Sequence, residues 1–203
     1  PAVIERLVDQ IQTLRQGSPE DFRNFLTAVI DRRAYDKITG YIDRARAATD
    51  CTILAGGGAR SDEGYFIEPT LVQTTNLKAE VLTEEIFGPV LGLYVYPDAD
   101  WSRMFRLIEQ GSDYALTGAV FADDRQAIAQ ATAGLASAAG NFYINDKPTG
   151  AVVNQQPFGG GRASGTNDKA GSVWNLLRWV NARTLKETFV PPVRYEYPFM
   201  QEA

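Results

Sequence analysis

The sequence predicts an α/β fold in which helices cross over between the strands of a parallel sheet. Between residues 90 and 146, segments of strand type alternate with segments of helix type, which is the order typical of such a sheet. The strand segments are short and apolar, as in GAVFA at 118–122, and this fits burial on both faces of the sheet. Hydrophobic residues make up 44% of the 203 residues, which is enough for one domain or slightly more.

Two helices are predicted before residue 50. The first spans residues 1–17, tolerates proline at its first position and ends at Gly17. Its apolar residues recur at helical spacing, at Val3, Ile4, Leu7, Val8, Ile11 and Leu14. Residues 21–30 follow as a loop with a short turn. The second helix, residues 31–48, has one apolar side, formed by Tyr35, Ile38, Tyr41 and Ile42.

The rest of the chain is predicted to alternate between strands and helices. Residues 51–57 form a short buried strand ended by glycines, and residues 65–74 are extended, with Pro69 marking an edge or a bend. The remaining elements are a helix at 79–85, a strand at 90–97, a helix at 101–111, a strand at 117–122, a helix at 124–138, a strand at 140–146, a helix at 172–179 and a strand at 182–190, before an irregular tail at 191–203.

Composition argues against several classes of partner and of chemistry. The net charge is −5 and the basic residues are scattered, whereas nucleic-acid binding needs a basic patch. No apolar run approaches the ~18 residues of a membrane span. The absence of histidine excludes Ser-His-Asp hydrolysis, Cys-His proteolysis and His-ligated zinc sites within the chain. We therefore expect no nucleic acid, no membrane and no metal as a partner.

The single cysteine, Cys51, cannot form a disulfide within the chain. The cytosol or the interior of an organelle therefore fits better than secretion. Cys51 opens an apolar strand and has no adjacent basic residue that would favour the thiolate. We interpret it as a buried structural thiol rather than a nucleophile.

Two glycine-rich stretches, at 55–60 and 159–165, are interpreted as tight turns and close backbone contacts. Neither has the G-x-G-x-x-G pattern between a strand and a helix, and neither has the GK[ST] of a phosphate-binding loop. The chain therefore holds no complete dinucleotide-binding motif.

The stretch EEIFGP, residues 84–89, places paired acids and an aromatic residue directly before a buried strand. A carboxylate at this position can accept hydrogen bonds from the two vicinal hydroxyls of a ribose, and the aromatic ring of Phe87 can cover a flat ring. Paired acids at the end of a short helix are also common as solvated surface groups. The residues alone leave both interpretations open.

Taken in order, EEIFGP, GAVFA, GNFYIND and PFGG followed by SG resemble the aldehyde dehydrogenases. More narrowly, the run from Asn141 to Gly171 resembles the Δ1-pyrroline-5-carboxylate dehydrogenases of that family, also called glutamate-γ-semialdehyde dehydrogenases. The resemblance extends from about Phe25 to the end of the chain. It implies that residues 1–180 are the C-terminal part of a catalytic α/β domain and that residues 181–203 are an oligomerisation strand and tail.

The resemblance also implies site residues for an NAD-dependent enzyme. Glu85 matches the glutamate that binds the nicotinamide-side ribose of NAD, and Phe87 matches the aromatic residue beside the nicotinamide. Gly150 and Ala151 match the loop whose backbone N–H groups hold the α-carboxylate of the substrate, and Phe158 matches an aromatic residue that flanks its methylene chain.

Two positions depart from the family pattern. Ala151 stands where serine is frequent, so a hydroxyl contact is lost while the backbone contact remains. Asn154 stands where glycine is common, which puts the geometry of the loop in doubt.

The family nucleophile is a cysteine, which the resemblance places before Pro1, together with the catalytic glutamate and asparagine and the Gly-rich cofactor domain. We therefore expect no catalytic residue in this chain, and Pro1 to follow either a trimmed methionine or a point of truncation. The resemblance implies oxidation of L-glutamate-γ-semialdehyde to L-glutamate in proline catabolism, within a homo-oligomer or with a companion N-terminal polypeptide. The alternative is a non-catalytic binding or assembly module. Residues 182–190 fit either a strand that pairs with another subunit or an ordinary edge strand.

Overall fold

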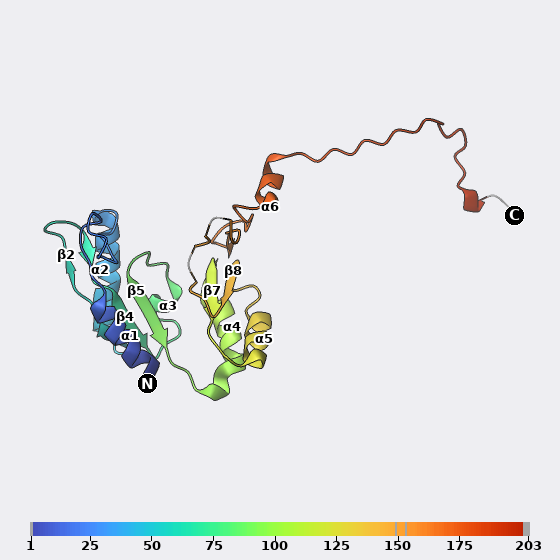
Figure 1. The fold of residues 1–203 in the computed structure, drawn as a ribbon. Coiled ribbons are helices and arrows are strands. Elements are labelled where there is room, and N and C mark those ends of the chain that lie inside the picture. Colours follow the sequence, from blue (N-terminus) through green and yellow to red (C-terminus); the bar gives the residue numbers. More distant parts are fainter. Residues whose placement is uncertain (1, 149, 153, 201–203) are drawn as a thin grey trace.

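The computed structural model describes residues 2–148, 150–152 and 154–200, which form two lobes and an extended tail (Figure 1). The first lobe comprises residues 2–94, and the second comprises the described part of 101–179. Residues 95–100 link the lobes and include the 3-10 turn η1 (Asp98–Asp100). The tail, residues 180–200, leads away from the second lobe and ends in the 3-10 turn η3 (Pro198–Met200).

The first lobe is built on a three-stranded mixed sheet with the order β1-β4-β5. Strand β1 pairs with β4 antiparallel, and β4 pairs with β5 parallel in the register Thr70 opposite Val90. Pro69 lies between β3 and β4, so the extended stretch predicted at 65–74 is interrupted at this proline. The elements of this lobe are α1 (Ala2–Thr13), α2 (Arg32–Ala47), β1 (Cys51–Ala55), β2 (Ala59–Arg60), β3 (Phe66–Ile67), β4 (Thr70–Thr74), α3 (Glu80–Thr83) and β5 (Val90–Tyr94).

Helix α2 forms the predicted amphipathic segment and carries one wall of the core. Its N-terminus is capped by Asp31, whose carboxylate accepts a hydrogen bond from the Ala34 amide at 2.7 Å. The buried side of α2 packs into a cluster of four isoleucines, Ile38, Ile42, Ile67 and Ile86. The last of these belongs to the EEIFGP stretch, so the core of the first lobe reaches directly under the predicted cofactor residues.

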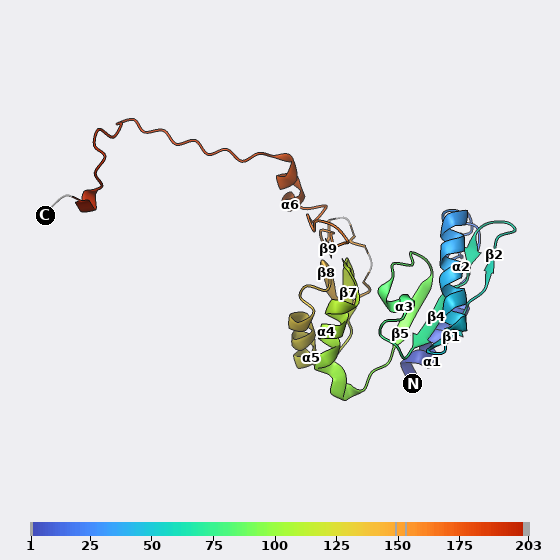
Figure 2. The same cartoon turned by 180° about the vertical axis from the view of Figure 1, so that it is seen from behind.

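The second lobe contains two helices beside a short parallel strand pair, as both Figure 1 and Figure 2 show. Strands β7 and β8 pair parallel, with Thr117 opposite Asn141, and α5 connects them. Gly134 lets α4 and α5 approach, because a Cβ there would lie 2.5 Å from a ring carbon of Phe105. The elements are α4 (Trp101–Gly111), β6 (Tyr114–Ala115), β7 (Thr117–Val120), α5 (Arg125–Gly134), β8 (Asn141–Ile144), β9 (Gly161–Arg162), α6 (Val173–Leu176) and the 3-10 turn η2 (Leu177–Trp179).

The prediction of one parallel sheet is confirmed for two strand pairs and is wrong for the whole. The mixed α/β class holds, but β5 and β7 lie in different sheets and β1 runs antiparallel. Two two-stranded pairs, β2-β3 and β6-β9, complete the set of small sheets. The alternation of strand and helix indicates which segments are strands, but the lateral neighbour of a strand depends on tertiary packing, which periodicity does not contain.

Residues 182–190 form no strand within this chain, so the prediction of an ordinary edge strand is wrong, whereas a strand that pairs with another subunit stays a prediction. Residues 181–188 have no regular secondary structure and residues 189–190 form a bend, and the whole stretch is exposed. A strand is stabilised by hydrogen bonds to a neighbouring strand, and none of the described residues supplies one here. Among the described residues, no helix is long and apolar enough to cross a membrane.

Candidate functional site

The first part of the candidate site is the turn that links α3 to β5. Ile86 is 7% exposed and fixed in the core, whereas Phe87 is 84% exposed and Glu85 is also exposed. Burial of Ile86 therefore forces its two neighbours outward, into the solvent beside the lobe. An exposed carboxylate and an exposed aromatic ring on either side of a buried anchor can contact a ligand without any movement of the core.

The backbone of this turn adopts a conformation that is rare for an aromatic residue. Phe87 has φ = 61°, in the left-handed region, which costs energy for a bulky side chain and occurs mostly at functional positions. Gly88 follows because a Cβ at this position would lie 2.5 Å from Cδ1 of Ile38. The motif thus combines a close approach of Gly88 to α2 with a strained backbone at Phe87, whose ring is exposed.

One residue of this half of the site was missed by sequence reasoning. Lys37, on α2, donates a hydrogen bond from Nζ to the backbone carbonyl oxygen of Glu85 at 2.6 Å. The contact joins residues 48 positions apart and fixes the peptide that carries the predicted ribose ligand. The only sequence signal is that Lys37 directly precedes Ile38, which belongs to the apolar side of the helix.

The second part of the candidate site follows β8 in the other lobe. Gly150 is exposed and Ala151 is half-buried, both in an irregular segment; Thr149 and Val153 lie outside the described residues. Asn154, where the family pattern favours glycine, has φ = 68°. Asparagine tolerates this left-handed conformation better than most residues, so the departure is compatible with the turn that glycine would make.

Phe158 is half-buried and tied down on both sides. Its backbone exchanges two hydrogen bonds with Ala170, at 2.9 and 2.8 Å. The side chain of Asn141 donates to the carbonyl oxygen of Pro157 at 2.9 Å and accepts from the amide of Gly159 at 3.1 Å. The ring that the sequence predicts to flank the substrate thus lies on a turn that hydrogen bonds hold on both sides. Asn141 is a second residue that sequence reasoning missed.

The two parts of the site lie in different lobes. Between the described residues of the first lobe and those of the second, no hydrogen bond or ion pair is formed. The structure therefore places Glu85 and Phe87 in the first lobe and Gly150, Ala151 and Phe158 in the second, with no hydrogen bond or ion pair between described residues of the two lobes.

The other two sequence interpretations concern glycines and the cysteine. The glycine-rich stretches are close backbone contacts as predicted, because a Cβ on Gly56 would lie 2.1 Å from the Pro69 oxygen and one on Gly160 would lie 2.9 Å from Cα of Leu116. Cys51 opens β1 as predicted but is half-buried rather than buried, since it lies at the end of a sheet. Within the described residues no cluster of His, Cys, Asp and Glu could hold a metal ion.

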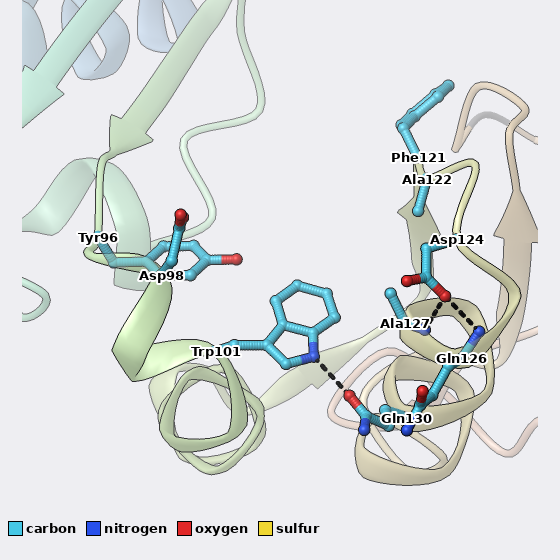
Figure 3. A pocket seen from close by; sticks show the side chains of 9 residues that line it. All are labelled: Tyr96, Asp98, Trp101, Phe121, Ala122, Asp124, Gln126, Ala127 and Gln130. Carbon is cyan, nitrogen blue, oxygen red and sulfur yellow. Dashed lines mark hydrogen bonds between the residues drawn. The ribbon is translucent and has the colours of Figure 1, made fainter.

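A cavity lies elsewhere, where the linker meets the second lobe (Figure 3). Its volume is about 750 Å³. Figure 3 shows the indole Nε1 of Trp101 donating to Oε1 of Gln130 at 3.0 Å across it, and Asp124 capping α5. Burial and the nearby Asp98 carboxylate raise the pKa of Tyr96, which faces this space. None of the five predicted site residues lines the cavity, so its size does not make it the candidate site.

Comparison with known proteins places the chain in a well-populated group. Residues 1–185 match the Aldehyde dehydrogenase family. The mitochondrial Delta-1-pyrroline-5-carboxylate dehydrogenase of Dictyostelium discoideum is 50% identical over 98% of this chain, which covers 36% of that protein. The chain thus spans about a third of the length of the curated relatives it matches.

Solved structures agree with the sequence comparison. The Delta-pyrroline-5-carboxylate dehydrogenase of Mycobacterium tuberculosis matches 97% of this chain at 48% identity, with a TM-score of 0.82, and the match covers 36% of that chain. The same enzyme bound with NAD matches at 49% identity with a TM-score of 0.81, again over 97% of this chain and 36% of that one.

Proposed function

The chain belongs to the aldehyde dehydrogenase family, and we propose from this premise that it is part of an NAD-dependent dehydrogenase. The proposed reaction is the oxidation of L-glutamate-γ-semialdehyde, the open form of Δ1-pyrroline-5-carboxylate, to L-glutamate in proline catabolism. The observation that carries the proposal is the 50% identity over 98% of the chain to a relative with that name. A working location in the mitochondrial matrix or the cytoplasm is compatible with the same relatives.

Glu85 and Phe87 are proposed to hold the nicotinamide riboside of NAD, which supplies the hydride acceptor when bound. The arrangement fits this group because both side chains face solvent on either side of the buried Ile86. The Glu85 carboxylate would accept hydrogen bonds from the ribose hydroxyls, and the ring of Phe87 would cover the flat nicotinamide. Lys37 would keep the Glu85 peptide in place through its bond to the carbonyl oxygen.

Gly150, Ala151 and Phe158 are proposed to bind the aldehyde. The backbone amides of the first two would donate to the α-carboxylate, because hydrogen bonds from N–H groups to a charged acceptor are short and strong. Ala151 offers no hydroxyl, so this contact rests on the backbone alone. The half-buried ring of Phe158 would cover the methylene groups between carboxylate and aldehyde.

The nucleophilic cysteine and the Gly-rich cofactor domain are proposed to lie in polypeptide outside these 203 residues. Two observations support this: the match covers 36% of the relatives' length, and Cys51 opens β1 rather than lying beside either half of the site. We assign residues 1–180 to the catalytic domain and residues 181–203 to contacts between subunits of a homo-oligomer. The unpaired, exposed stretch at 181–190 supports the second assignment.

The experiment combines mass spectrometry of the purified protein, first native and then denatured, with an NADH assay on the same sample. We expect a complete polypeptide or a companion chain that carries a cysteine and a Gly-rich domain, and NADH formation on addition of Δ1-pyrroline-5-carboxylate. A complete assembly that binds NAD but leaves this aldehyde untouched would remove the substrate assignment. A pure 203-residue species, alone or as a homo-oligomer, would favour the non-catalytic binding module.

A further inference from the structure

We propose that Lys169 and Asn141 form a positioning pair that holds Phe158 in register for the carbon chain of the aldehyde. The inference deepens the proposed function and rests on it. Neither residue reaches solvent in the way Glu85 does: Asn141 is 8% exposed and Lys169 is half-buried. Together the two side chains connect three chain segments.

Asn141 clamps the peptide on both sides of Phe158. It is the first residue of β8, and its side-chain amide donates to the Pro157 oxygen while its side-chain oxygen accepts from the Gly159 amide. A single planar amide thus satisfies one acceptor before the ring and one donor after it. Any shift of the backbone that carries Phe158, relative to β8, breaks at least one of these bonds.

Lys169 closes the clamp from a third segment. Its ammonium donates to the Gly140 carbonyl oxygen and lies 3.3 Å from both the Asn141 side-chain oxygen and the Gly159 carbonyl oxygen. An ammonium has three donors and no acceptor, so three converging oxygens match its full capacity. The next residue, Ala170, exchanges both of its backbone bonds with Phe158.

Glycines make this convergence possible. A Cβ on Gly140 would lie 2.1 Å from the Gly159 oxygen, and a Cβ on Gly159 would lie 3.2 Å from the Lys169 amide nitrogen. The start of β8 and the turn after Phe158 therefore meet backbone to backbone, with no room for a packed side chain between them. Hydrogen bonds from Asn141 and Lys169 take the place that apolar packing has elsewhere.

The charge of Lys169 points to a positioning role rather than an ion pair. No carboxylate among the described residues lies within salt-bridge distance of it, whereas the neighbouring Asp168 is paired with Arg178 at 2.9 Å. Removing the ammonium consequently leaves no buried anion without a partner. The expected effect is a looser turn at 157–159 in a protein that stays folded.

The test compares Lys169→Met, Lys169→Arg and the control Lys78→Met in the complete dehydrogenase that contains this chain. Lys78 is exposed, and its side chain contacts neither half of the site. We expect Lys169→Met to raise the KM for the aldehyde about tenfold, with the KM for NAD unchanged, because the proposed NAD residues lie in the other lobe. Lys169→Arg retains hydrogen-bond donors and should therefore raise the KM for the aldehyde less. Lys78→Met should have the same KM for the aldehyde as the wild type.

Hydrogen–deuterium exchange on the same proteins reports on the clamp independently of turnover. The amides of Phe158 and Gly159 are both bonded, so Lys169→Met should accelerate their exchange while the β1–β4 amides stay protected. Two results would refute the positioning role of the pair. One is unchanged exchange at 157–159 in Lys169→Met, and the other is an equal change in KM and kcat for the aldehyde and for NAD. Faster exchange in an enzyme whose wild type ignores the aldehyde would keep the clamp but refute its substrate role, and with it the inference.

Discussion

At the residue scale, one buried side chain decides what its two neighbours can do. Ile86 is held by three other isoleucines from α2 and β3, and this fixes the direction in which Glu85 and Phe87 leave the chain. The strained φ of Phe87 is stable because the core on one side and β5 on the other define the turn. Packing of Ile86 thus fixes the backbone that carries both predicted cofactor residues.

Glu85→Gln should weaken the handling of NAD without unfolding the protein. The carboxylate is exposed and its side chain supports no other described contact, so its loss affects only what it binds. A charged acceptor contributes roughly 1.5–3 kcal/mol, which predicts a rise of about ten- to a hundredfold in the KM for NAD of the complete enzyme. Glu84→Gln, one residue earlier, is the matched control, and an unchanged KM for NAD in Glu85→Gln would refute the ribose assignment.

At the element scale, close approaches between segments matter more than the length of any strand. Most strands here have two to five residues, and the elements are held by contacts such as that of Gly88 with Ile38 of α2. The same kind of contact joins β8 to the turn at 157–159. Substitutions at these close approaches should therefore lower the free energy of unfolding more than substitutions on the exposed faces of the strands.

Gly88→Ala should destabilise the first lobe by about 1–3 kcal/mol, the usual cost of overpacking a filled core. The added methyl group would meet three atoms of the fully buried Ile38 at 2.5–3.0 Å. Gly111→Ala, where a Cβ meets nothing within 4 Å, is the control and should be neutral or slightly stabilising. Melting temperatures measure the stability of both alanine variants. Adding Ile38→Val to Gly88→Ala should restore part of the lost melting temperature, because valine lacks the Cδ1 atom that the new methyl group meets. Equal melting temperatures for the two alanine variants would contradict the crowding argument.

The link between Asp168 and Arg178 should make the end of the second lobe sensitive to acid. A hydrogen bond from the Thr166 hydroxyl, and then the Arg178 guanidinium, lower the pKa of Asp168 below its ordinary value of 3.8. A lowered pKa means that the stabilisation is complete above about pH 4 and is lost as the pH falls through the folded value. Wild type and Asp168→Asn should therefore differ in melting temperature at pH 6, and the difference should shrink as the pH is lowered below 3.8. A difference that does not shrink on acidification would contradict this.

At the scale of the whole molecule, the chain consists of two locally folded lobes, and each lobe carries some of the residues that the resemblance predicts for the site. The lobes share no hydrogen bond or ion pair between described residues, and β5 and β7 each end a separate sheet. Within the described residues, the chain at 95–100 joins the two lobes, and no hydrogen bond or ion pair adds to this connection. Joint action of Glu85 and Phe158 then depends on whatever else packs against both lobes.

The isolated 203-residue chain should therefore show no dehydrogenase activity. Its single thiol, Cys51, opens β1, in the other lobe from the proposed aldehyde-binding residues Ala151 and Phe158, so the chain offers no cysteine nucleophile beside them. The measurement is NADH formation from Δ1-pyrroline-5-carboxylate by protein whose purity is established by mass spectrometry. Turnover by that preparation would disprove the proposed division of the site.

The parts of this structure that sequence could predict are those encoded locally. Helix α2 is predicted by Ile38 and Ile42 at helical spacing, and the interruption of the extended stretch 65–74 is predicted by Pro69. The motif residues Glu85 and Phe158 were identified by resemblance, and their roles remain predictions. The separation of β5 from β7, and the contacts of Lys37 and Asn141, depend on segments distant in sequence, which periodicity and propensity do not encode.

The tail has a consequence for the lifetime of the protein in a cell. Phe189 and Val193 are 90% and 94% exposed, on a backbone that has no hydrogen-bonded neighbour among the described residues. Extended chain with bare apolar side chains is what chaperones capture and proteases cut. If another subunit covers this segment, association also protects the tail from chaperones and proteases. Association depends on concentration, so the lifetime of the protein should rise with its concentration.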